Sequence, residues 1–539
     1  MGKYSNYLNK GIERNHEDDL SSIVKIDRWI FVLLLIGIGV TPLILGASFT
    51  DVVSPLISER STLSSGSKAE IFTNFKHTFL LVITLITSLL FLYKYYILGD
   101  QIKKTTINWF LIIFIASLLI STLLAPYKTI AIFGQFNRND GALAYISYSI
   151  LLFIGMNITY PKRALHYILF SLYPFILINI VIITFNFTGH DLLSYERVMN
   201  FITATLPDNA SVDAGSSLVG TLNQWNYMAG MGGILVTLLL AGSMLAKNMI
   251  IKVSHLIFAL ISFAITLMAL STSGFFTISL IMILLIALVF RLPNKRMATL
   301  SLVIFILAAG GILHTLASEN PRVWDESVGL ISSTNPYREE VQAQQAAPST
   351  YQTSLDLSFL VPSVSAAETF TLPELPARDI APGSGRLYIW EKSLDMVTER
   401  PIFGYGMDTF MYHFPHTDIG MRSGLRTENV TVDKPHNIFI AVLFGTGIVG
   451  FIGFLGLVSI PVLLMLKYGY LKIPNQTTQE YVAILGLGWL AFLIQGLVND
   501  SLPGTSGPLF IIGGMMLGLM YQELRDKDIN DQTSELKLV

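Results

Sequence analysis

The sequence predicts an all-α polytopic membrane protein with about twelve transmembrane helices and one large extracytoplasmic loop before the third-last helix. Of the 539 residues, 52% are hydrophobic and only 13% are charged, whereas soluble proteins carry about 25% charged residues. The mean hydropathy is +0.57. Apolar stretches of roughly 20 residues, the length needed to cross a bilayer, recur along the chain. Most of the chain is therefore expected to lie away from water.

The expected spans form two groups, separated by the longest polar segment of the chain. The first group comprises residues 29–48, 77–98, 107–125, 142–158, 165–185, 227–246, 255–270, 275–290 and 298–316. The second group comprises residues 438–466, 481–498 and 509–521. The stretch 438–466 is long for one crossing, so we expect a bend at Gly445, Gly447 or Gly450. The first span is long for the apolar region of a signal peptide and is expected to be retained.

The positions of lysine and arginine predict that both termini are cytoplasmic, because cytoplasmic loops carry an excess of these residues. Basic residues gather in both tails and in the even-numbered connections, whereas the outer connection "NDSLPGTSGP" has none. The predicted order is a cytoplasmic tail over 1–28, membrane helices one to nine within 29–316, a large extracytoplasmic loop over 317–435, membrane helices ten to twelve within 436–521, and a cytoplasmic tail over 522–539.

The large loop has two parts that differ in composition. Residues 343–385 are rich in Ala, Ser, Thr and Pro and are expected to be irregular. The following stretch, "SGRLYIWEKSLDMVTERP", is typical of a helix with Ser384 as its cap and Pro401 at its end. The side chains expected on its apolar face are Leu387, Trp390, Leu394 and Val397.

Composition also excludes several classes of function. The chain has no cysteine, which excludes disulfides, thiolate nucleophiles and cysteine metal sites. The net charge of -2 gives no reason to expect nucleic acid as a partner. The expected spans are almost free of ionisable residues, whereas an ion-driven transporter usually needs a charged relay inside the bilayer. The polar groups instead gather at the outer ends of helices, which suits chemistry on a lipid-anchored substrate.

Two polar patches precede the large loop. "FGQFNRNDGALAY" carries Arg138, which either binds a ligand or pairs with lipid phosphate or with Asp140. "GTLNQWNYMAG" brings Asn223, Gln224 and Asn226 to a helix start, where asparagine is most often a cap. Each patch has both a structural and a ligand-binding interpretation.

Two further patches lie in and directly after the loop. Arg386 stands at the start of the expected loop helix, either available to a ligand or stacked on Trp390 one turn away. His436 and Asn437 stand where the polar segment meets the membrane. A histidine there is either an interfacial structural residue or a base, because imidazole titrates near neutral pH. Asn437 is placed to cap the helix that follows.

The order and spacing of these patches resemble the O-antigen ligase family, whose superfamily also contains O-antigen polymerases and protein O-oligosaccharyltransferases. The specific part is "RLYIWEKSLDMVTERPIFGYGMDTF", followed by "HNIFIAVLFGTGIVGFIGF". "GTLNQWNYMA", "STSGFF" and "FNRNDG" are similar to further family stretches. The resemblance implies about twelve helices with a large outer loop. It also implies glycan transfer from a polyprenyl-diphosphate carrier to an acceptor hydroxyl, without a metal or cofactor.

The resemblance assigns roles that fit the chemistry of the residues. His436 would be the general base and Arg386 would stabilise the leaving diphosphate, since a guanidinium matches phosphate oxygens bidentately. The expected substrate-binding residues are Arg138, Asn226, Asn437, Trp390, Arg422 and Arg426. The expected partners are the lipid-linked glycan donor, a glycan, lipid or protein acceptor, and the lipid bilayer of a bacterial cytoplasmic membrane.

The chain also departs from the family pattern. Ligases of the family commonly carry arginines at two places that here hold Ser216–Ser217 and Gly274. Other arginines would have to take their role. A chain polymerase and a protein O-oligosaccharyltransferase of the same fold remain alternatives to a ligase. A lipid-linked glycan flippase or exporter is the alternative from another class, but it would need charged residues along a central cavity. A non-catalytic assembly partner is a further alternative.

Overall fold

The computed structural model describes residues 16–56, 64–206, 220–222, 224–332, 334–338, 376, 380–425 and 430–536. In this part of the chain, ten helical segments are long and apolar enough to cross a membrane. They are α3 (Asn74–Tyr96), α4 (Thr106–Leu124), the α7–α8 pair (Ala164–Ser171 and Tyr173–Phe187), α10 (Trp225–Leu245), α11 (Met249–Met268), α12 (Thr272–Arg291), α13 (Lys295–Glu319), α18 with η5 (Ile438–Met465 and Leu466–Leu471), α19 (Gln476–Gly496) and α20 (Pro503–Leu536). The predicted class, an all-α polytopic membrane protein, is confirmed.

The two remaining expected spans also coincide with helices, α2 (His16–Val40) and α6 (Ala142–Asn157). α6 is apolar but short for a crossing. α2 begins before the predicted span and carries Asp27, whose carboxylate pairs with Lys94 of α3 at 2.7 Å. Both side chains of this pair are 1% exposed, so the charges neutralise each other inside the bundle.

α10 lies at the centre of the bundle, and its whole apolar stretch is buried inside the protein. It packs against α11, α12, α13 and α19, while α20 packs on α6 and α18 on α4. Small residues make these approaches close, as is usual between membrane helices. A Cβ on Gly233 of α10, for example, would lie 2.9 Å from the carbonyl oxygen of Gly274 on α12. The centre of the bundle is therefore filled by protein.

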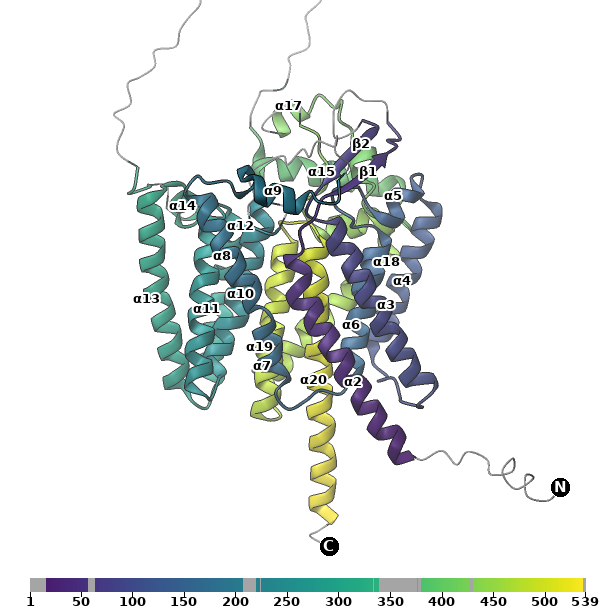
Figure 1. The fold of residues 1–539 in the computed structure, drawn as a ribbon, viewed down its shortest axis with the longest axis vertical. Coiled ribbons are helices and arrows are strands. Elements are labelled where there is room, and N and C mark those ends of the chain that lie inside the picture. The colour runs from purple at the N-terminus through teal and green to yellow at the C-terminus, as the bar shows by residue number, and fades with distance from the viewer. Residues whose placement is uncertain are drawn as a thin grey trace, which may run out of the picture.

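One end of the bundle carries most of the short elements, and the start of α2 and the end of α20 lie at the other end (Figure 1). The short elements are η1 (Thr41–Leu43), β1 (Ser48–Val52), β2 (Gly66–Glu70), α5 (Lys128–Phe133), η2 (Leu192–Ser194), α9 (Glu196–Ile202), α14 (Arg322–Asp325), η3 (Val328–Leu330), η4 (Pro382–Gly385), α15 (Arg386–Glu399), α16 (Phe410–His413) and α17 (Met421–Gly424). Within the described residues the only sheet is the antiparallel pair β1–β2, which the sequence did not predict.

α15 is the predicted loop helix, but its cap differs from the prediction. The N-cap is Gly385, which adopts the left-handed φ of 88° and makes no side-chain cap hydrogen bond. Ser384 also has a positive φ, 60°. Its side chain is therefore not the cap, because an N-cap residue normally has an extended backbone from which its oxygen reaches the first turn.

The buried face of α15 also differs from the predicted apolar stripe. Leu387 and Leu394 are 53% and 48% exposed, whereas Ile389, Ser393 and Met396 are buried. Both sets of residues satisfy helical spacing, so spacing alone does not choose between them. Ile389 and Met396 are selected because they pack into an apolar cluster with loop residues such as Tyr405 and with Phe444 of α18.

The predicted bend in the long stretch 438–466 occurs at Gly447, where α18 is interrupted by a backbone with φ 65° and ψ -171°. The loop segment "PIFGYG" fills this interruption. The amide of Tyr405 donates to the carbonyl of Phe444 at 3.0 Å, and that of Gly406 donates to the carbonyl of Gly445 at 2.9 Å. A Cβ on Gly404 would overlap the carbonyl oxygen of Phe444. The Gly-x-Gly pattern is therefore required where the loop docks on the broken helix.

Single cysteines test which end of the bundle faces the outside. Thr398 on α15 and Gln101 between α3 and α4 are exposed, and the chain has no cysteine of its own. An impermeant thiol reagent applied to intact cells should label Thr398→Cys, because the Lys/Arg distribution predicts that its end is outside. Gln101→Cys should react only after permeabilisation. Labelling of Gln101→Cys alone in intact cells would reverse the predicted orientation.

Candidate functional site

His436 lies directly before α18 and is oriented by a buried carboxylate. Its Nδ1 is 2.8 Å from Oδ2 of Asp500, in the connection between α19 and α20. The His436 side chain is 33% exposed and that of Asp500 is 1% exposed. A carboxylate at Nδ1 favours the proton on that nitrogen, which leaves Nε2 as an acceptor. His436 adopts a left-handed φ of 53°, a conformation uncommon outside glycine that surrounding contacts must hold.

Asp500 is held in its ionised form by the cations around it. Burial raises the pKa of Asp500, but His436, Lys434 and Arg138 outweigh this effect and hold the pKa well below its usual value. A buried anion of this kind stabilises an imidazolium when His436 takes a proton.

Asn437 and Trp390, both predicted to bind substrate, support the backbone around His436. The Asn437 side chain accepts from the amides of Phe439 and Ile440 at 2.9 and 3.1 Å, which confirms it as the cap of α18. Trp390 Nε1 donates to the carbonyl of Pro435 at 2.8 Å. With the contact between His436 and Asp500, all three residues in "PHN" are thus fixed by hydrogen bonds. Among the described residues, no cation–π contact joins Arg386 to Trp390.

Arg138 lies inside a buried network beside this histidine. It is 3% exposed, forms a short ion pair with Asp433, and lies 3.4 Å from the hydroxyl of Tyr227. The Tyr227 hydroxyl is in turn 3.4 Å from Oδ2 of Asp500. The predicted pairing of Arg138 with Asp140 is wrong, because the carboxylate of Asp140 contacts another cation.

That cation is Lys434, whose ammonium joins three connections at the loop end of the bundle. It lies 3.2 Å from Asp140, 3.5 Å from Asp408 and 3.4 Å from the carbonyl of Ser501. Burial raises the pKa of Asp140 to about 6, with Lys434 opposing the shift and Asp408 adding to it. Burial opposes charge on Lys434 too, but Asp408 and Asp140 raise its pKa above the usual value. The ammonium therefore stays charged although its side chain is 4% exposed.

A cavity of about 560 Å³ lies between the N-terminal ends of α10, α12, α14 and α15, and we call it the arginine cavity. It brings together the predicted residues Arg386 and Asn226 with Ser273 of "STSGFF" and with Arg322 and Glu326, which the sequence did not single out. In the described part of the chain, no acidic side chain pairs with either guanidinium. Burial lowers the pKa of Arg386, and the carboxylate of Asp500 opposes that shift. Arg386 therefore also interacts electrostatically with Asp500.

The helices α10, α12 and α15 also direct their N-termini toward the arginine cavity. Its lining includes Trp225 and Asn226 in the first turn of α10, Ser271 and Thr272 at the start of α12, and Arg386 at the start of α15. None of these three helices has a side-chain hydrogen bond at its N-cap. Helix N-termini present free amide groups and a partial positive charge. Two guanidinium groups and three helix ends therefore make the cavity attractive to anions.

The remaining predicted residues are dispersed. Arg422 lies on α17, which packs on α15, and it does not line the arginine cavity. Arg426, Asn223 and Ser216–Ser217 lie outside the described residues. Gly274 lies in the first turn of α12, where a Cβ would overlap the carbonyl oxygen of Ala229. No side chain, and hence no arginine, fits at that position without displacing α10.

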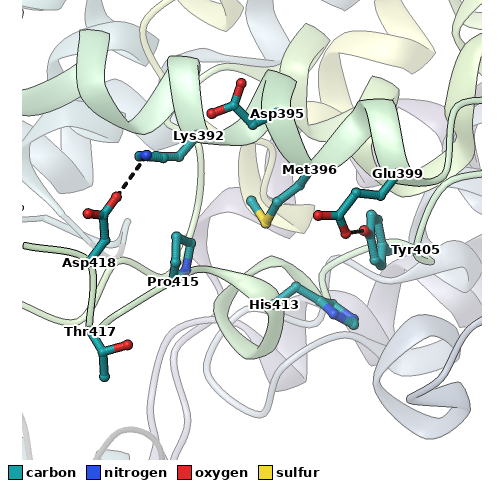
Figure 2. Close-up of a pocket in the computed structure, with 9 residues that line it drawn as sticks. All are labelled: Lys392, Asp395, Met396, Glu399, Tyr405, His413, Pro415, Thr417 and Asp418. Atoms are coloured by element: carbon teal, nitrogen blue, oxygen red, sulfur yellow. Dashed lines mark hydrogen bonds and ion pairs between the residues drawn. The ribbon is translucent and has the colours of Figure 1, made fainter. Parts of the chain in front are cut away.

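A second hollow of about 410 Å³ lies between α15 and the segment after it. Figure 2 shows its lining residues Lys392, Asp395, Met396, Glu399, Tyr405, His413, Pro415, Thr417 and Asp418. Lys392 pairs with Asp418 at 2.8 Å, and the Tyr405 hydroxyl donates to Glu399 at 2.7 Å. None of its lining residues is shared with the arginine cavity. Its charged groups mainly fasten the loop to α15.

Sequence reasoning missed Asp500, Lys434 and Arg322. The signal for Asp500 was an acid in the short outer connection "NDSLPGTSGP", and Lys434 stands two residues before His436. No sequence spacing relates Asp500 to His436 or Arg322 to Arg386, because these residues are brought together only by the packing of separate helices.

The fold and this site define a multi-pass membrane protein whose polar chemistry is gathered at one end of the bundle. Residues 257–455 match the family model described as O-Antigen ligase. The matched range includes the arginine-bearing helix α15, His436 and the broken part of α18. This match confirms the resemblance and supports an enzyme of the ligase or polymerase type. No curated protein matches the chain.

The ion pairs of Lys434 and Lys392 allow a matched test of buried charge. Lys434→Met leaves Asp140 and Asp408 without their cation at 4% and 1% exposure, and it should lower the free energy of unfolding by about 3–5 kcal/mol. Lys392→Met removes a pair whose side chains are 27% and 24% exposed, and it should lower it by about 1 kcal/mol or less. Thermal unfolding in detergent measures both. Equal effects of the two substitutions would contradict the assigned role of Lys434.

Proposed function

We propose that the protein transfers a glycan from a polyprenyl-diphosphate carrier to an acceptor hydroxyl at the outer face of the bacterial cytoplasmic membrane. The observation that carries this proposal is the placement of the His436–Asp500 pair beside a cavity lined by two guanidinium groups that have no acidic partner among the described residues. One part of the site accepts a proton and the other part attracts an anion. Glycan transfer from a diphosphate needs both.

The arginine cavity would hold the diphosphate of the donor. Breaking the bond between the sugar and the diphosphate places negative charge on the leaving group. Preorganised donors stabilise such charge strongly in a water-poor site. Arg386 supplies a planar fork that matches two phosphate oxygens, and the first turns of α10, α12 and α15 supply backbone amides. In this proposal the chain's own cations, without a metal, stabilise the leaving diphosphate.

The His436–Asp500 pair would activate the acceptor. Nε2 of His436 takes the proton of the acceptor hydroxyl as its oxygen forms a bond to the anomeric carbon of the donor sugar. The bond from that carbon to the diphosphate oxygen breaks, and its electron pair stays on the diphosphate. Asp500 stabilises the resulting imidazolium through Nδ1. Attack from the face opposite the leaving group inverts the configuration at the anomeric carbon.

The proposed arrangement in the membrane follows from the distribution of lysine and arginine, which predicts that both tails are cytoplasmic. The tails 1–28 and 522–539 would be cytoplasmic, the helices within 29–316 and 436–521 would span the membrane, and 317–435 would lie outside. The arginine cavity would then face the leaflet in which a translocated lipid-linked glycan presents its diphosphate. Arg138, Asn226, Trp390 and Asn437 would support the donor site mainly by fixing its walls.

Ligase, chain polymerase and protein O-oligosaccharyltransferase differ in the acceptor and share this chemistry. The hydroxyl of a glycan, a lipid or a protein would in each case transfer its proton to His436. A flippase, in contrast, needs a polar path through the membrane. The central helix α10 is buried along its whole apolar stretch, and the cations of the site lie at one end of the bundle. These observations favour a transferase.

His436→Gln tests the base directly. Glutamine keeps a polar side chain at the start of α18 but takes no proton at neutral pH, so glycan transfer should fall about 10²–10⁴-fold. Binding of the lipid-linked donor to the purified protein should be retained. Transfer is measured with purified donor and acceptor, and folding by thermal unfolding. Near-normal transfer by His436→Gln would remove His436 from the chemistry.

Asp500→Asn tests the positioning of that base. Loss of the carboxylate removes the group that fixes Nδ1–H and stabilises the imidazolium, so the maximal rate should fall about 10²-fold or more. Binding of the lipid-linked donor should be retained, because Asp500 does not line the arginine cavity. An unchanged maximal rate would show that Asp500 serves packing alone.

Arg386→Lys tests the bidentate contact in the cavity. An ammonium keeps the charge but not the planar fork, so donor affinity should fall about tenfold or more. Arg400→Lys is the matched control, because Arg400 lies at the other end of α15 and faces the ring of Tyr405. Full donor affinity in Arg386→Lys would reduce Arg386 to a point charge.

A further inference from the structure

Arg322 approaches the arginine cavity from a different element than Arg386 does. It is the first residue of α14, the short helix that follows α13, and its side chain lines the cavity with Arg386. Arg322 is exposed, and within the described residues no acidic group pairs with its guanidinium. An unpaired guanidinium on a cavity wall is available to an anionic ligand.

Of the three acids within four residues of Arg322 in the chain, Asp325 and Glu326 have other partners. Asp325 pairs with Arg338 at 2.7 Å and accepts from the Asn335 amide at 2.9 Å. Glu326, which also lines the cavity, accepts from the hydroxyl of Thr272 at 2.6 Å. Arg338 thus neutralises the carboxylate that would otherwise compete for Arg322. Within the described residues, these contacts leave Arg322 without a carboxylate partner.

The backbone that presents Arg322 is held in place by several contacts. Val323 is 1% exposed and packs in the main core. Trp324 Nε1 donates to the carbonyl of Thr334 at 3.1 Å, and its ring lies 5.5 Å from that of Tyr337. Tyr337 is hydrogen-bonded to His314 of α13 at 2.8 Å. A fixed backbone limits where the long side chain can reach, which favours a defined contact over a diffuse one.

We propose that Arg322 is the second guanidinium of the diphosphate site, so that Arg322 and Arg386 bind the two phosphoryl groups from different walls of the arginine cavity. This inference rests on the proposed function for the identity of the ligand. Its geometric basis is that Arg322 of α14 and Arg386 of α15 line the same cavity from different elements. The cavity of about 560 Å³ is large enough for a diphosphate with part of the attached sugar or lipid.

A binding measurement on the purified full-length protein in nanodiscs tests this assignment. The probes are undecaprenyl diphosphate, undecaprenyl monophosphate and inorganic pyrophosphate. Arg322→Ala should weaken binding of the lipid diphosphate about 10–100-fold, the usual effect of losing hydrogen bonds to a charged group. Binding of the monophosphate should change much less, because it engages one guanidinium. Arg322→Lys should recover only part of the loss.

Arg197→Ala is the matched control, because Arg197 is an exposed arginine on α9 that does not line the cavity and, within the described residues, forms no contact with the acids around Arg322. It should bind the lipid diphosphate like the wild type, and both variants should keep the wild-type thermal unfolding temperature. Inorganic pyrophosphate separates the sources of the ligand. If Arg322→Ala weakens pyrophosphate binding as well, the diphosphate group is what Arg322 recognises. Weakening of the lipid ligand alone would assign Arg322 to the carrier lipid and overturn the inference.

The outcomes separate this inference from the proposed function. Wild-type protein that binds no lipid diphosphate would refute the proposed donor site and the inference together. Wild-type binding that is unchanged in Arg322→Ala would refute the inference alone and leave the proposed function standing. Equal losses for the diphosphate and the monophosphate would make Arg322 a general point charge and would also overturn the assignment.

Discussion

The buried ammonium of Lys434 is the interaction on which the arrangement of the site depends. It joins the connection before α6 through Asp140, the segment after α15 through Asp408, and the connection before α20 through Ser501. A buried charge must be paired, and leaving one unpaired is strongly destabilising. Because each partner comes from a different part of the chain, the pairing fixes three connections relative to one another. His436 lies two residues after Lys434, so the contacts of Lys434 also help to fix its position.

The broken helix α18 supplies the second constraint. An interruption inside a membrane helix frees backbone carbonyls that need new partners. Here the "PIFGYG" segment provides them, with amides of Tyr405 and Gly406 on the carbonyls of Phe444 and Gly445. The large loop is thereby fastened to the bundle through its backbone. The same docking holds α15 so that Trp390 reaches the carbonyl of Pro435 and Arg386 reaches the arginine cavity.

These two constraints bring opposite electrostatic environments close together. Carboxylates of Asp500 and Asp433 surround His436 and Arg138, while the arginine cavity presents cations and helix N-termini. Charges interact more strongly in a protein interior than in water. If they were free in solution, the carboxylate that supports the base and the guanidinium groups of the cavity would form ion pairs with each other, and neither would be available for its role. The helix ends hold the carboxylate of Asp500 and the guanidinium of Arg386 at fixed positions, and within the described residues the two form no ion pair. Each group therefore retains its own role in the proposed transfer.

The sequence alone determined the membrane class, the position of the long apolar helices and the bend in α18, and it predicted the functional roles proposed for His436 and Arg386. Apolar length and glycine placement are local properties, and they control whether a segment enters a bilayer and where it breaks. The sequence did not determine the face of α15, because two sets of residues share helical spacing, nor the β1–β2 hairpin. It also gave no means of pairing Arg138 with Asp433 or His436 with Asp500. Those pairs join residues far apart in the chain, and only tertiary packing decides which buried charges meet.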